Sequence, residues 1–154
     1  MTVRTRVIGI GRASAGDDGV GLAVVDALRA ASLGSGVDLC NVSEPTALIP
    51  LLEGASRVVL VDAVVGAGRA GEVLALSADD LDDVAPRLFS THGVSVAQAL
   101  ALARALAPDG PSADVKIVAV CIARPTGPAH GLSAEIAAAV PRAAAAVVAC
   151  IEEV

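Results

Sequence analysis

Aromatic side chains are almost missing from this sequence of 154 residues, in which Phe89 is the one phenylalanine and tryptophan and tyrosine do not occur. Proteins that bind single-stranded nucleic acid stack its bases on aromatic rings, so this composition disfavours such a function. Positive charge is also scarce, because Lys116 is the one lysine beside ten arginines and the formal net charge is −6. An acidic chain repels phosphate groups. We therefore expect neither nucleic acid nor an anionic membrane surface as a partner.

Long apolar runs are missing too, although 55% of the residues are hydrophobic and the mean hydropathy is +0.70. The longest stretch without a charged residue runs from Leu88 to Ala103, and it contains polar side chains such as Ser90 and Gln98. A spanning helix needs about 20 mostly apolar residues, so we expect no membrane insertion. Much of the apolar content is alanine, at 33 residues, which favours helices. The composition predicts an aliphatic core with alanine-rich helices.

The three cysteines form no CxxC pair, which disfavours a thiol-zinc site and a redox pair. Cys40, Cys121 and Cys150 all lie in apolar segments and are expected to be buried thiols in a reducing compartment. The N-terminus carries only a short apolar run before Arg12, too short for a signal peptide. These features predict a cytoplasmic protein.

Apolar runs alternate with helical patterns along the chain. The patterns predict strands over 3–10, 37–42, 57–64, 72–76 and 115–122. They predict helices over 19–31, 45–53, 95–107 and 133–152, the last with a break at Pro141. The run Val58–Val61 is apolar on both faces, as in a covered parallel sheet. The alternation predicts an α/β fold: one domain over residues 1–154, a three-layer α/β/α sandwich with a mostly parallel central sheet.

A glycine-rich turn, Gly9-Ile10-Gly11, follows the first predicted strand and raises the possibility of a nucleotide-binding domain. The third glycine of the dinucleotide fingerprint would fall on Ser14, and no Gly-Lys-Ser/Thr follows. Two carboxylates, Asp17 and Asp18, stand where phosphate would bind. Nucleotide binding therefore remains only an alternative, which saturable nucleotide binding would support.

Three polar residues follow predicted strands or loops and are expected at the same edge of the sheet: Asp18, Asp62 and His92. Taken alone, Asp17 and Asp18 are typical of a helix N-cap. The other histidine, His130, is expected on a surface loop. Two carboxylates close together repel each other, and a bound cation would relieve that repulsion. Two oxygens and an imidazole suit nickel or zinc with open coordination positions.

The sequence resembles the [NiFe]-hydrogenase maturation proteases over nearly its whole length. The resemblance rests on three motifs in order and on the C-terminal segment. The motifs are Gly9-Ile10-Gly11 with Asp17-Asp18-Gly19-Val20-Gly21, then Val58-Val59-Leu60-Val61-Asp62-Ala63 with Gly66 and Gly71, and then Ser90-Thr91-His92-Gly93. The C-terminal segment is Gly131-Leu132-Ser133-Ala134-Glu135, followed by Ala139-Val140-Pro141.

The resemblance implies a hydrolase: an endopeptidase that removes a C-terminal extension from the hydrogenase large-subunit precursor after nickel insertion. It implies that Asp18, Asp62 and His92 act as catalytic residues and ligands for nickel supplied by that precursor, with no permanent cofactor. Either the nickel polarises the scissile carbonyl or a water, or it only docks the substrate while a carboxylate moves protons. No Ser–His–Asp order and no HExxH motif is present, which disfavours the common protease classes.

One position departs from the family, because Arg12 stands where an asparagine usually follows Gly-x-Gly. A charged guanidinium does not replace a neutral amide. We expect Arg12 and Asp17 to contact the substrate, and a pairing of Arg12 with Asp17 is one hypothesis. The departure keeps open another alternative, a non-catalytic assembly factor for a nickel enzyme.

Overall fold

The computed structural model describes residues 3–78, 80, 96–106 and 114–153. Five strands form one sheet in the order β2-β1-β3-β5-β4. They are β1 (Val3–Ile10), β2 (Val37–Val42), β3 (Ala55–Val65), β4 (Val73–Ser77) and β5 (Asp114–Ile122). The pairs β1–β2, β1–β3 and β3–β5 are parallel, and β4 runs antiparallel to β5. The expected mostly parallel sheet is confirmed.

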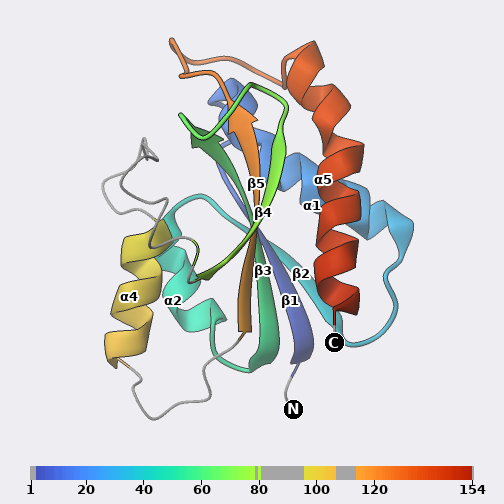
Figure 1. The fold of residues 1–154 in the computed structure, drawn as a ribbon, viewed down its shortest axis with the longest axis vertical. Helices are drawn as coiled ribbons and strands as arrows, with labels where there is room; N and C mark the ends of the chain where they lie inside the picture. Colours follow the sequence, from blue (N-terminus) through green and yellow to red (C-terminus); the bar gives the residue numbers. More distant parts are fainter. Residues whose placement is uncertain (1–2, 79, 81–95, 107–113, 154) are drawn as a thin grey trace.

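Helices cover both faces of this sheet (Figure 1). Helices α1 (Val20–Ala31) and α5 (Ala134–Glu152) pack on one face, where alternate strand residues such as Val59 and Val61 point. The short α2 (Leu48–Leu51) and α4 (Val96–Leu106) pack on the other, against residues such as Val58 and Leu60. The three-layer α/β/α architecture follows from strands that are apolar on both faces.

Two predicted helices begin differently from the expectation. A 3₁₀ turn, η1 (Gly16–Gly19), precedes α1, and a second one, η2 (Pro45–Ala47), precedes α2. Neither η1 nor α1 has a side-chain hydrogen bond at its N-cap, which is Ala15 for η1 and Gly19 for α1. The interpretation of Asp17 and Asp18 as helix caps is therefore wrong, since the carboxylates bond elsewhere.

Helix α5 runs without interruption through Pro141, so the expected break there is wrong. A proline removes one main-chain donor, but its fixed φ is compatible with helical backbone. Among the described residues, α5 is also the one helix long and apolar enough to cross a membrane, with a hydropathy of 1.7. One face of the helix is buried in the core and includes Ile136, Ala139, Ala143 and Val147.

All three cysteines are free thiols, as expected. Cys121 and Cys150 are buried, and Cys40 is half-buried. Burial raises the pKa of each of these thiols above its ordinary value. The thiols therefore stay protonated, which makes them packing residues rather than nucleophiles.

Candidate active site

Asp62 lies in the sheet where the pairing between β1 and β3 ends. The last paired residues of these strands are Gly9 and Val61, whereas β3 continues beside β5, with Asp62 opposite Ala119. From this point β1 leads into η1 and α1 on one face of the sheet, while α2 and α4 cover the other. Such a divergence at the carboxyl ends of parallel strands creates a crevice that commonly holds a binding site.

The Asp62 carboxylate is poorly solvated. Burial is the main cause that raises its pKa to about 8, and the nearby charge of Asp18 makes a smaller contribution in the same direction. The main-chain N–H of Ala63 donates to Asp62 Oδ1 at 2.8 Å. This hydrogen bond lowers the Asp62 pKa, but by less than burial raises it. At neutral pH the Asp62 carboxyl therefore holds a proton, and a cation would compete for it.

Asp18 lies in η1 and is 8% exposed. Its Oδ2 accepts a hydrogen bond of 3.2 Å from the main-chain N–H of Arg12. Asp18 is close enough to Asp62 for its charge to affect the Asp62 pKa. The structure thus brings two of the predicted site residues together. His92 and the motif Ser90–Gly93 lie outside the described residues.

Glycines allow η1 and α1 to approach the sheet this closely. A Cβ on Gly21 would overlap the main-chain oxygen of Val61, and it would lie 2.7 Å from that of Ile10. A Cβ on Gly11 would overlap the main-chain oxygen of Asp18. A side chain at either position would push η1 and α1 away from the strands. The glycine pattern of the first motif therefore serves close packing that sets Asp18 beside β3.

Arg12 and Asp17 do not pair with each other, so that hypothesis is wrong. The Arg12 guanidinium forms an ion pair with Glu44, with 3.0 Å between Nη2 and Oε1. Asp17 Oδ1 accepts from the main-chain N–H of Ser133 at 2.7 Å, and Asp17 Oδ2 accepts from the Ser133 hydroxyl at 3.0 Å. Sequence reasoning missed Glu44 and Ser133 as partners. The one available signal was the position of Ser133 at the first residue of a predicted helix.

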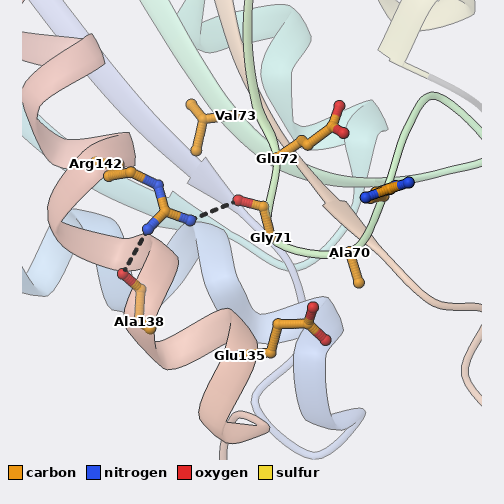
Figure 2. A pocket seen from close by; sticks show the side chains of 8 residues that line it. Ala70, Gly71, Glu72, Val73, Glu135, Ala138 and Arg142 are labelled. Atoms are coloured by element: carbon orange, nitrogen blue, oxygen red, sulfur yellow. Dashed lines mark hydrogen bonds between the residues drawn. The ribbon is translucent and has the colours of Figure 1, made fainter.

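A separate open pocket of about 590 Å³ lies between the segment that leads into β4 and helix α5 (Figure 2). Arg142 closes one side of it by donating to the main-chain oxygens of Gly71 and Ala138. Glu72 and Glu135 also line it, but Asp18 and Asp62 do not. Among the described residues, no group of three His, Cys, Asp or Glu side chains is placed to hold a metal. A three-ligand site would therefore need a residue such as His92.

Comparisons with known proteins give a consistent result. Residues 24–150 match a family model described as hydrogenase maturation protease. Among solved structures, the [NiFe] hydrogenase maturation protease HybD from Thermococcus kodakarensis is similar, with a TM-score of 0.78 and 22% identity over 97% of this chain and 99% of that one. No curated protein matches the chain by sequence.

Two further solved structures share this fold. The hydrogenase maturating endopeptidase HybD from E. coli has a TM-score of 0.80 and 21% identity, covering 96% of this chain and 91% of that one. The hydrogenase 2 maturation peptidase from Thaumarchaeota archaeon SCGC_AB-539-E09 has a TM-score of 0.70 and 28% identity, covering 97% of this chain and 98% of that one.

Proposed function

The chain belongs to the hydrogenase maturation protease family, and from that premise we propose the reaction it catalyses. It removes the C-terminal extension of a [NiFe]-hydrogenase large-subunit precursor after nickel has been inserted. The enzyme is a cytoplasmic hydrolase whose protein partner is that precursor. It recognises the nickel that the precursor carries and holds no permanent cofactor of its own.

The observation that carries the proposal is that the two carboxyl groups of Asp18 and Asp62 lie near each other at the carboxyl edge of the sheet. Burial of Asp62, with a smaller contribution from the charge of Asp18, raises the Asp62 pKa to about 8, so the two carboxyl groups favour the arrival of a cation. Two carboxylate oxygens with the imidazole of His92 suit nickel with open positions. The precursor's own cysteines would supply the remaining ligands, which explains why the enzyme needs so few.

In the proposed mechanism, Asp18, Asp62 and His92 are catalytic residues that dock the precursor through its nickel. The nickel then polarises the scissile carbonyl or a water molecule. Asp62 releases its proton as the cation binds and can afterwards accept a proton from the attacking water. Arg12 and Asp17 remain predicted contacts of the precursor, with Asp17 also holding Ser133.

The test is cleavage of a purified large-subunit precursor with and without nickel, followed by intact mass. The expected result is a shortened C-terminus only for the nickel-loaded precursor. Asp18→Asn, Asp62→Asn and His92→Ala should each lower the cleavage rate by at least about 100-fold. Asp26→Asn, at an exposed acid on α1, is the matched control and should cleave normally.

No shortening of the nickel-loaded precursor, under conditions where another family member shortens it, would overturn the proposal. Stable binding of that precursor without cleavage would instead indicate an assembly factor. Saturable nucleotide binding in place of precursor binding would indicate a nucleotide-binding domain.

A further inference from the structure

Arg12 contacts Asp18 through its main chain and forms an ion pair with Glu44 through its side chain. The Arg12 main-chain N–H donates to the Asp18 carboxylate, whereas its guanidinium points to Glu44. Both side chains of the pair are about half exposed, at 45% for Arg12 and 57% for Glu44. Arg12 therefore contacts a proposed nickel ligand through its main chain, while Glu44 holds its guanidinium.

Main-chain bonds fix both ends of this pair. The Gly11 N–H donates to the oxygen of Val42, which joins the segment after β1 to the end of β2. The Arg12 oxygen accepts from the Ala15 N–H, and the Glu44 oxygen accepts from the Ala47 N–H next to the buried Pro45. The direction of the guanidinium therefore depends on which carboxylate attracts it, not on movement of the backbone.

An exposed ion pair of this kind contributes little to the stability of a fold. A guanidinium binds carboxylates through two parallel hydrogen bonds, and the Asp18 carboxylate already accepts a hydrogen bond from the Arg12 main chain. In the absence of Glu44, the Asp18 carboxylate is therefore a neighbouring acid to which this guanidinium could turn.

We propose that Glu44 is a positioning residue, which holds the Arg12 guanidinium away from Asp18. A guanidinium on Asp18 would compete with the nickel of the precursor for the same carboxylate. The inference rests on the proposed function, because it takes Asp18 to be a ligand of that nickel. Glu44 itself contacts neither the nickel nor the scissile bond in this account.

A double-mutant cycle tests the proposal through cleavage of the nickel-loaded precursor. Glu44→Ala should raise KM by about tenfold or more with little change in kcat, as expected for the loss of a group that supports a metal ligand. In the Arg12→Ala background, Glu44→Ala should have no further effect on KM, because the competing guanidinium is gone. An equal loss in both backgrounds, or no loss in either, would overturn the proposal.

Asp26→Ala removes the acid from a comparable exposed ion pair with Arg29 on α1 and serves as the control, with unchanged KM. A crystal structure of Glu44→Ala gives a result that does not depend on cleavage. It should show the Arg12 guanidinium within hydrogen-bond distance of the Asp18 carboxylate. A guanidinium that still points to solvent would overturn the positioning role, even if the wild-type enzyme cleaves. If the guanidinium turns while wild type does not cleave, only the proposed function fails.

Discussion

Asp17 and Ser133 join two parts of the chain that are 116 residues apart in sequence. The two oxygens of the Asp17 carboxylate accept hydrogen bonds from the main-chain N–H and the hydroxyl of Ser133. Ser133 Oγ also accepts from the Ile136 N–H and so caps helix α5. The acid beside Asp18 thus fixes the start of the C-terminal helix against η1.

Replacing Asp17 should therefore destabilise the protein. Asp17→Ala removes two charge-assisted hydrogen bonds and releases the capping serine, so we expect the free energy of unfolding to fall by about 1–2 kcal/mol. Urea unfolding followed by circular dichroism measures the change. Asp26→Ala removes an exposed acid of α1 and should stay within about 0.5 kcal/mol of wild type. Equal stability of Asp17→Ala and wild type would show that the Ser133 contact contributes nothing.

Gly21 is the point at which α1 approaches the sheet most tightly. Gly21→Ala would place a Cβ against the main-chain oxygens of Val61 and Ile10, and neither can move without disturbing a buried strand. We expect a loss of about 2–4 kcal/mol in unfolding free energy, together with a displaced η1. Thermal unfolding measures the first effect, and cleavage of the precursor reports the second.

The control for Gly21→Ala is Gly127→Ala. An added Cβ at Gly127 meets nothing within 4 Å, and its φ lies outside the left-handed region. That substitution should change stability by less than about 0.5 kcal/mol. If both substitutions have the same small effect, the close approach of α1 is not what sets the position of Asp18.

Arg57 fastens the other end of helix α5. Its guanidinium donates to the main-chain oxygens of Cys150 and Glu153, and it pairs with Asp114 on the neighbouring strand. Arg57→Met keeps the apolar stem but leaves those oxygens without their donor, so we expect a loss of about 1–2 kcal/mol in urea unfolding. Arg29→Met, at an exposed pair within α1, is the control and should be nearly neutral.

The element order and the three layers could be predicted because buried strands and amphipathic helices have distinct apolar periods. The proximity of Asp18 and Asp62 followed from one further rule, that parallel strands end at a common edge. The bonds of Asp17 to Ser133 and of Arg12 to Glu44 could not be predicted in this way. They join polar side chains 116 and 32 residues apart, and no local pattern distinguishes such partners from other exposed charges.

Pro141 shows a different limit of the sequence. Proline disfavours helix interiors, so a break was the reasonable expectation. The helix continues because its buried positions on both sides of Pro141, Ala139 and Ala143, pack against the same core. Tertiary packing of the helix thus outweighs the low helix preference of proline, which is all that the local sequence indicates.

Asp62→Asn should make stability less dependent on pH. The pKa of Asp62 rises from 3.8 to about 8 on folding, so the folded state binds this proton more tightly than the unfolded chain. Stability from this group is therefore fully present below about pH 4 and is lost as the pH rises to about 8. Asparagine carries no charge at any of these pH values and can still accept the Ala63 hydrogen bond through Oδ1.

The variant should consequently match wild type near pH 4 and exceed it in unfolding free energy by on the order of 3–5 kcal/mol near pH 8. Urea unfolding at a series of pH values measures the difference, with Asp26→Asn as the control at an exposed carboxyl. A constant difference across the series would mean that Asp62 titrates near its ordinary value. The same variant is expected to lose cleavage of the nickel-loaded precursor. Its gain in stability and its loss of activity would then have one cause, the removal of a buried carboxylate that is costly to ionise and that binds the nickel.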